Sequence, residues 1–201
     1  MLEVDDQTLR RFLRARDLDI EKASVMFLKY LNWRRTYVVN GSISPSEVPN
    51  EISQNKFFLQ GLDKNGRPVV VLLASRHFQH KGGLDEIKRM LLSIPPGQEK
   101  FVIIADLEGW GYSNTDIHAC LADLSLEYYP ERLGKIFIVR HPYIFMPVWK
   151  ILHPFIDNKT KKKIEFVGNK KLESTLLEVI DETQLPQIYG GQLPLVPIQD
   201  A

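Results

Sequence analysis

The apolar positions of this chain follow two different periods. Continuous runs of β-branched and aliphatic residues, typical of strands buried on both faces, occur at Pro68–Leu73, Phe101–Asp106 and Ile136–Val139, and Ile164–Val167 shows the same pattern more weakly. Helical spacing separates these runs, at Leu84–Ser93, Thr115–Tyr128 and Ile144–Phe155. Strands that alternate with helices predict an α/β domain with right-handed crossovers and a mainly parallel sheet.

The first forty residues have helical spacing throughout. Asp5 opens a helix that places Phe12 on its apolar face and ends near Asp17, and a second amphipathic helix begins near Ile20. A Gly-, Ser- and Pro-containing stretch follows and predicts a linker. We therefore expect a helical N-terminal module over residues 1–38, a linker over 39–55 and the main domain over 56–201.

The segment Pro142–Ile156 does not fit an ordinary covering helix, because it is apolar nearly all round and broken only by Lys150 and His153. Two interpretations stay open. It is either a helix wedged into the core, or a movable gate with one face over a cavity and the other toward a bilayer. In the second case Phe145, Trp149 and Phe155 are the gate residues that enter the membrane.

Composition narrows the function classes. The chain of 201 residues is 44% apolar, which is enough for one main core. With 26 basic and 25 acidic residues it lacks the basic excess of a nucleic-acid binder. The single cysteine, Cys120, and the lack of a leader predict a cytoplasmic address. No apolar run reaches the ~18 residues that span a bilayer, so membranes are expected to be met from the surface.

Polar side chains stand close to the predicted ends of two strands. Glu131 and Arg132 precede one strand, and Thr160 and Lys163 precede the next, with very apolar sequence between them. A carboxylate, a guanidinium, a hydroxyl and an ammonium beside apolar strands indicate a polar head site next to an oily cavity. Taken alone, Glu131 and Arg132 also fit a solvated ion pair.

Four motifs in order resemble the CRAL-TRIO (Sec14-like) lipid-binding and phosphatidylinositol-transfer family. They are Leu9-Arg-Arg-Phe-Leu-Arg-Ala-Arg16, Asp63 to Val69, Tyr128 to Val139, and Leu185-Pro186 to Gly190-Gly191. The resemblance covers almost the whole chain. It implies a helical N-terminal piece on an α/β lobe, whose sheet floors a lipid pocket closed by a gate helix similar to Pro142–Ile156.

The resemblance also implies a site for the phosphatidylinositol headgroup. The matching positions here are Arg16, Asp63, Glu131, Arg132, Thr160 and Lys163. Arginine and lysine can offset phosphate charge, threonine can donate to a phosphate oxygen, and the carboxylates can accept from inositol hydroxyls. The remaining basic side chains near this point are expected to face either solvent or an anionic membrane; they are Lys159, Lys161, Lys162, Lys170 and Lys171.

A second set of positions departs from the family pattern. Members that also hold phosphatidylcholine use four hydroxyl-bearing residues, and the matching positions here are Leu59, Val70, Phe101 and Ile103. Burying a choline phosphate without donors is unfavourable. We therefore expect phosphatidylcholine binding to be weak, or replaced by a more apolar second ligand.

These observations predict a non-enzymatic carrier that binds phosphatidylinositol and transfers it between membranes. We expect no cofactor and no metal, bound phospholipid as the ligand, a monomer that is peripheral at membranes, and a lipid kinase as the partner to which the lipid is presented. His77 and His80 have metal-like spacing but no third ligand close in sequence.

Three alternatives stay open. The apolar second site also suits a small hydrophobic ligand of the tocopherol, retinoid or sterol type. Asp106 and Glu108 follow a strand, where α/β enzymes keep catalytic carboxylates, although the loop residues nearby favour a structural role. Finally, the domain is consistent with a membrane-targeting piece of a larger protein.

Overall fold

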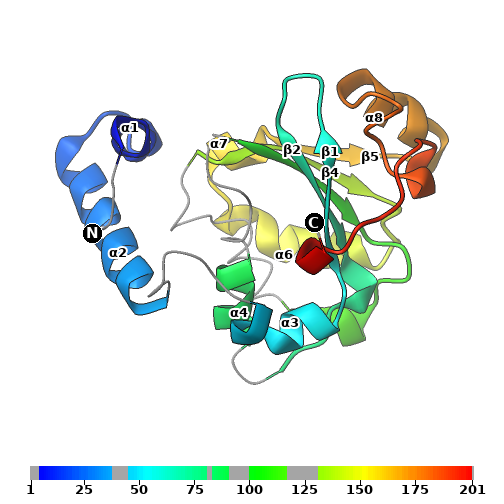
Figure 1. Cartoon of the computed structure of the whole chain (residues 1–201), viewed down its shortest axis with the longest axis horizontal. Coiled ribbons are helices and arrows are strands. Elements are labelled where there is room, and N and C mark those ends of the chain that lie inside the picture. The colour runs from blue at the N-terminus through cyan, green and yellow to red at the C-terminus, as the bar shows by residue number, and fades with distance from the viewer. Residues whose placement is uncertain (1–4, 38–44, 81–82, 91–99, 117–130, 201) are drawn as a thin grey trace.

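The computed structural model describes residues 5–37, 45–80, 83–90, 100–116 and 131–200. Its centre is a five-stranded sheet with the strand order β1-β2-β3-β4-β5 (Figure 1). The strands are β1 (Phe57–Leu62), β2 (Pro68–Leu73), β3 (Phe101–Asp106), β4 (Leu133–Val139) and β5 (Ile164–Val167). β1 runs antiparallel to β2, and the other neighbours are parallel. The predicted α/β class with a mainly parallel sheet is confirmed.

β1 is the strand that the sequence analysis missed. Its pairing with β2 is irregular between Gln60 and Leu62, and Gly61 has a φ of +34°. In the sequence, Gln60 and Gly61 interrupt the kind of apolar run that marks the other strands. The available signal was the turn at residues 63–67, since a turn between two apolar runs predicts a hairpin.

Seven helices of the described chain surround the sheet. They are α1 (Asp6–Ala15), α2 (Ile20–Tyr37), α3 (Pro49–Ser53), α4 (Gly83–Met90), α6 (Phe145–Leu152), α7 (Asn158–Lys161) and α8 (Leu172–Val179). α3 and a 3-10 turn at Pro45–Glu47 lie inside the stretch expected to be a linker. Most of the helix predicted at Thr115–Tyr128, with Cys120, lies outside the described residues.

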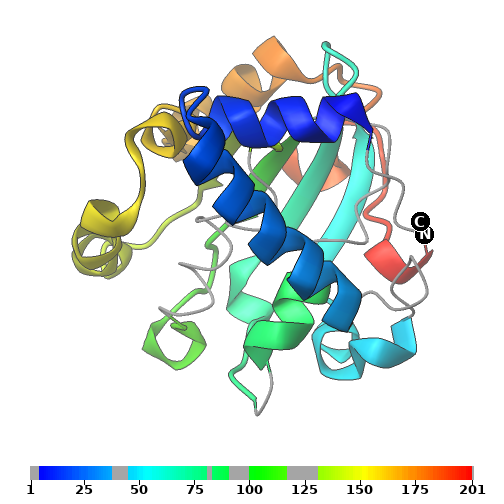
Figure 2. The same ribbon diagram turned by 90° about the vertical axis from the view of Figure 1, so that its left-hand side faces the viewer.

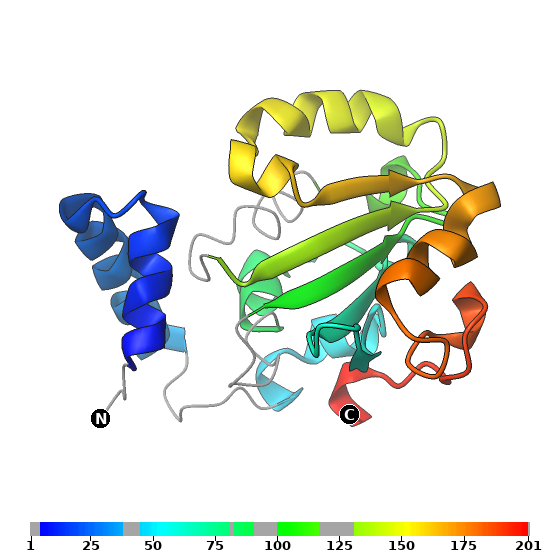
Figure 3. The ribbon, with the colours of Figure 1, turned by 90° about the horizontal axis from the view of Figure 1, so that it is seen from above.

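The two faces of the sheet carry two separate cores. On one face Val69, Val71 and Ile104 pack with Leu176 of α8, and all of these side chains are fully buried. On the other face Val70, Phe101 and Ile136 pack with Phe145 and Leu152 of α6. Figure 3 shows α6 and α8 on opposite sides of the strands. This alternation along each strand is the pattern of a sheet covered on both faces.

α1 and α2 form a small unit of their own at one edge of the molecule. Phe12 of α1 packs against Phe27 and Tyr30 of α2, with ring centroids 5.0 and 5.2 Å away. Figures 2 and 3 show the two helices crossing beyond the ends at which β4 and β5 begin. No helix in the described ranges is long and apolar enough to cross a membrane.

Candidate functional site

The amino ends of β4 and β5 bring the first candidate residues together. Glu131 and Arg132 directly precede β4, and Lys163 directly precedes β5. The amide of Ile136 donates to the carbonyl of Lys163 at 2.8 Å, which locks the two strand starts side by side. Lys163 Nζ then lies 3.9 Å from Glu131 Oε2, and the Arg132 side chain is buried. Glu131 has a φ of +62°, uncommon for a non-glycine residue and often found at functional sites.

Thr160 is held at the same end by a helix cap. Asp157 is the N-cap of α7, and its Oδ1 accepts from the amides of Lys159 and Thr160 at 2.8 and 2.9 Å. Burial raises the pKa of Asp157, but the hydrogen bonds from Thr160 and Lys159 lower it more, so the carboxylate stays ionised. The Thr160 side chain is buried beside this cap.

Arg16 lies at the end of the N-terminal helix α1. It is the C-cap residue of α1, is partly buried, and donates from Nη1 to the carbonyl of Ala15 at 3.0 Å. Its neighbours contact α7, because Lys159 Nζ donates to the Arg14 carbonyl at 3.0 Å and to Asp17 Oδ1 at 2.7 Å. The end of α1 therefore lies beside the helix that carries Thr160.

Asp63 lies apart from this group. It is buried in the β1–β2 turn, where Oδ2 accepts from Arg67 Nε at 2.7 Å and contacts Nη2 at 2.6 Å. A Cβ atom on Gly134 would lie 2.8 Å from Arg67 Nη1, so the guanidinium rests against the start of β4. Asp63 therefore contacts the amino end of β4 indirectly, by holding Arg67 in place. Arg67 was not among the site residues predicted from the sequence.

The four apolar positions predicted for a second ligand lie on the face of the sheet beneath α6. Leu59, Val70 and Ile103 are paired in one row across β1, β2 and β3, and the row continues to Ile136 and Ile164. Phe101 precedes Ile103 by two residues on the same face.

This face keeps accessible surface at its centre. Ile103 and Ala105 of the middle strand β3 are only partly buried, whereas Val102 and Ile104 on the opposite face are fully buried. A central strand packed tightly on both faces would have no such difference. The described residues therefore cover this face of β3 less completely than the opposite face.

α6 presents different residues to the two sides. Phe145 points inward and is buried, with its ring 5.4 Å from Trp110, and the Trp149 ring lies 5.1 Å from Phe166. Phe155, in the turn after α6, is 71% exposed. The other large apolar side chains exposed along this segment are Tyr143, Ile144, Met146 and Ile151. Of the three predicted gate residues, Phe155 therefore faces outward, while Phe145 and Trp149 line the inner side.

Asp106 and Glu108 form a structural tie at the opposite, carboxyl edge of the sheet. The Tyr189 hydroxyl donates to Asp106 Oδ2 at 2.9 Å, and the amide of Glu108 donates to Asp106 Oδ1 at 2.9 Å. Arg140 pairs with both carboxylates. Burial, and next the charge of Asp106, raise the pKa of Tyr189, so its hydroxyl remains a donor. Oδ2 of Asp106 thus joins β3 to Arg140 after β4 and to Tyr189 of the C-terminal segment, while Oδ1 holds the turn at Glu108.

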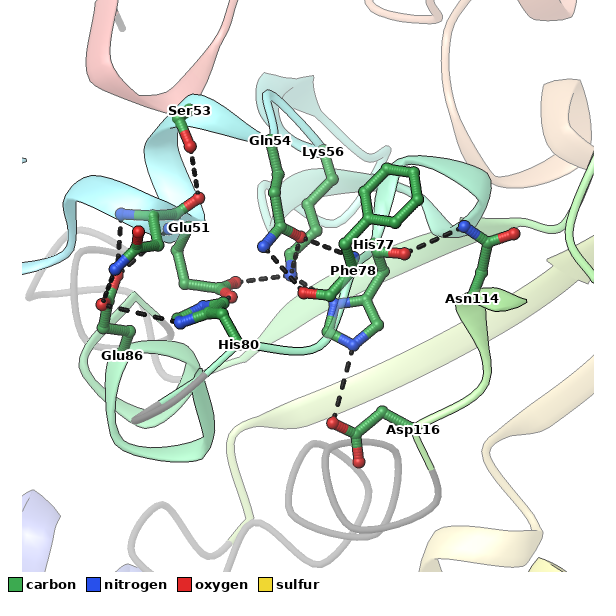
Figure 4. A network of polar contacts seen from close by, with 11 residues as sticks. Glu51, Ser53, Gln54, Lys56, His77, Phe78, His80, Glu86, Asn114 and Asp116 are labelled. Atoms are coloured by element: carbon green, nitrogen blue, oxygen red, sulfur yellow. Dashed lines mark hydrogen bonds and ion pairs between the residues drawn. The ribbon is translucent and has the colours of Figure 1, made fainter. Parts of the chain in front are cut away.

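A second buried polar group, which we name the Lys56 cluster, joins α3 to the segments that follow β2 and β3 (Figure 4). Lys56 Nζ lies 2.6 Å from Glu51 Oε2, 2.9 Å from Gln54 Oε1 and 2.6 Å from His77 Nδ1. His80 Nε2 contacts Glu51 Oε1 at 3.1 Å. These three acceptors match the three protons of an ammonium.

The two histidines therefore belong to an ion-pair network. His77 Nδ1 accepts from Lys56, and Nε2 faces Asp116 Oδ2 at 3.7 Å. Across residues 5–37, 45–80, 83–90, 100–116 and 131–200, no group of three or more His, Cys, Asp or Glu side chains is placed to hold a metal ion.

Comparisons with known proteins agree with this architecture. A family model described as the CRAL/TRIO domain matches residues 52–191. A CRAL-TRIO domain-containing protein of Saccharomyces cerevisiae is 31% identical, over 94% of this chain and 71% of its own length. The Sec14 cytosolic factor of Schizosaccharomyces pombe is 29% identical, over 94% of this chain and 75% of its own length.

Two further comparisons bear on the branch and the fold. A phosphatidylinositol/phosphatidylcholine transfer protein of Arabidopsis thaliana, SFH12, is 29% identical over 93% of this chain, which spans 39% of that relative. The crystal structure of Sfh5 superposes with a TM-score of 0.66 over 93% of this chain and 71% of that one, at 18% identity. The chain belongs to the CRAL/TRIO domain family and, by these relatives, to its Sec14-like members.

Proposed function

We propose that this protein binds phosphatidylinositol and transfers it between membranes. The observation that carries the proposal is that Arg132, Thr160 and Lys163 lie at or just before the amino ends of β4 and β5, two strands of the sheet whose apolar face packs against α6. Donors of this kind suit an inositol phosphate, and the apolar sheet face beneath α6 suits acyl chains. A diacyl lipid has on the order of 30 methylenes at ~0.8 kcal/mol each, so exposing its tails to water would cost more than about 20 kcal/mol. A carrier must therefore enclose both tails. The names of the relatives, which include phosphatidylinositol transfer proteins, support the same class.

The headgroup is assigned to Arg16, Glu131, Arg132, Thr160 and Lys163, with Asp63 acting through Arg67. In this assignment the cations and Thr160 meet the phosphate, and Glu131 meets an inositol hydroxyl while it orients Lys163. The α6 segment serves as the gate, and Phe155 and Tyr143 are its membrane-facing residues because both are exposed. The carrier works as a cytoplasmic monomer that meets membranes from the surface and presents its lipid to a kinase.

The second ligand is proposed to be more apolar than phosphatidylcholine. Leu59, Val70 and Ile103 form one continuous apolar row, and a choline phosphate placed against it would lack donors. The same row favours a small hydrophobic ligand as the second candidate function. A hydrolase is less well supported, since Asp106 is already bonded to Tyr189 and the amide of Glu108.

A transfer assay tests the headgroup assignment. Donor vesicles carry labelled phosphatidylinositol or labelled phosphatidylcholine, and acceptor vesicles carry neither. Lys163→Ala and Glu131→Ala are expected to slow phosphatidylinositol transfer selectively. Lys162→Ala, which removes an exposed cation from the same segment, is the matched control. Unchanged phosphatidylinositol transfer by both site variants would overturn the assignment.

A further inference from the structure

Lys159 joins the N-terminal helices to the segment that follows the gate. Its ammonium donates to Asp17 Oδ1 at 2.7 Å and to the carbonyl of Arg14 at 3.0 Å. The bonded partners are 142 and 145 residues apart in sequence. One side chain therefore links the end of α1 to α7.

The acceptors on α1 suit a cation. The Arg14 carbonyl lies in the last turn of the helix, where the backbone dipole and the terminal carbonyls favour positive charge. Asp17 and Leu18 follow with φ angles of +53° and +66°. Two consecutive non-glycine residues in this region are uncommon, and their conformation needs support from surrounding contacts. Lys159 provides one such contact at Asp17.

Lys159 and Thr160 occupy the same short helix but face different ways. Both amides donate to the N-cap Asp157, which fixes the orientation of the turn. The Lys159 side chain then extends to α1, whereas the Thr160 side chain is buried. A movement of α7 would shift the Lys159 contact and the Thr160 hydroxyl together.

We propose that Lys159 is a positioning residue for the headgroup site, which clamps α1 against α7 so that Arg16 is held beside Thr160 and Lys163. This proposal rests on the proposed phosphatidylinositol site. Arg16 lies between the two clamped residues, Arg14 and Asp17, so the clamp fixes its backbone from both sides. Because α7 follows α6 after a single short turn at His153–Phe155, displacement of the gate would also release Arg16.

The charges around the clamp agree with this role. The hydrogen bond from Lys159 holds the pKa of Asp17 below its ordinary value, and the same bond raises the pKa of Lys159. Asp157 and Glu131 face the ammonium from the α7 cap and the start of β4, and Arg16 and Lys22 face Asp17 from the N-terminal helices. Lys159 was grouped in the sequence with cations that face solvent or membrane, but its ammonium is directed to α1.

The test combines Lys159→Ala with Arg16→Ala and measures retention of labelled phosphatidylinositol by the full chain after exposure to acceptor vesicles. Because an exposed pair contributes little on its own, Lys159→Ala is expected to weaken retention about two- to fivefold. In the Arg16→Ala background it should cause no further loss, since it acts through Arg16. Lys162→Ala should behave like the wild type. The exchanged pair Asp17→Lys with Lys159→Glu should recover part of the loss caused by Lys159→Glu.

The outcomes distinguish a failure of the clamp from a failure of the proposed function. If the wild type retains phosphatidylinositol and Arg16→Ala weakens retention but Lys159→Ala does not, the clamp is overturned and the proposed function stands. Equal losses from Lys159→Ala with and without Arg16 would mean a general structural role, which also overturns the clamp. If the wild type retains no phosphatidylinositol, the proposed function fails and the clamp fails with it.

Discussion

Replacing Glu51 by glutamine isolates the charge of the buried ion pair with Lys56. The substitution keeps the size of the side chain and removes the carboxylate that lies 2.6 Å from the ammonium. Both side chains are almost completely buried, with 0% and 1% exposure. Glutamine leaves the Lys56 charge in the interior with neutral acceptors alone, among them Gln54 and His77.

The expected cost follows from that burial. Removing one partner of a buried ion pair destabilises a protein by about 3–5 kcal/mol, because the remaining charge is left uncompensated. A domain is stable by roughly 5–15 kcal/mol in total, so this loss is a large fraction of the whole. For about 200 residues each kcal/mol shifts Tm by roughly 2–4 °C, which predicts a decrease of about 6–20 °C.

Chemical unfolding followed by circular dichroism measures this effect. The matched control is Glu165→Gln, because Glu165 pairs with Lys135 at the same distance of 2.6 Å while both side chains are one third or more exposed. The control is expected to lose at most about 1 kcal/mol. Equal losses of stability in the two variants would contradict this prediction, because burial would then have no effect on the energetic contribution of an ion pair.

Three further predictions concern other parts of the fold. Burial and the Lys56 charge lower the pKa of His77 below 6.5, so the contribution of His77 to stability is present above about pH 6.5. It is lost at lower pH, where the unfolded state takes up the proton. Unfolding free energies at pH 7.5 and 5.5 should therefore differ less for His77→Gln than for the wild type. Gly134→Ala should destabilise the protein by about 1–3 kcal/mol in chemical unfolding, because the new Cβ would lie 2.9 Å from the carbonyl oxygen of Phe101. A neutral result would mean that β3 and β4 can separate there without cost. Asp157→Ala should cost about 1 kcal/mol through loss of the α7 cap and should also weaken phosphatidylinositol retention, whereas Asp157→Asn, which keeps a capping oxygen, should retain most of the stability.

The sequence predicted the elements whose signals are local. The runs at Pro68–Leu73 and Phe101–Asp106 agree with β2 and β3, because a strand buried on both faces needs apolar residues at every position. The helix predicted to begin at Ile20 agrees with α2, because its apolar residues recur at helical spacing within the segment itself. β1 was missed because Gln60 and Gly61 interrupt its run.

The candidate site was predictable only in part. Glu131, Arg132, Thr160 and Lys163 were singled out because they stand close to predicted strands and match motif positions of the family that the chain resembles. The partners of Lys159 were not predictable, since the contact with Asp17 spans 142 residues, and neither was the contact of Arg67 with β4, which depends on the strand order. The roles of His77 and His80 likewise depend on Lys56, which nothing in the local sequence connects to them.

The identity of the lipid that the purified protein retains tests most directly whether the protein binds phosphatidylinositol through Lys163. Lipids are extracted from the wild type and from Lys163→Ala and Lys162→Ala, and each extract is quantified by mass spectrometry against protein. We expect phosphatidylinositol to be the main phospholipid of the wild type and of the Lys162→Ala control, and to be lost from Lys163→Ala. Phosphatidylcholine as the main lipid, or phosphatidylinositol retained equally by all three proteins, would contradict this expectation.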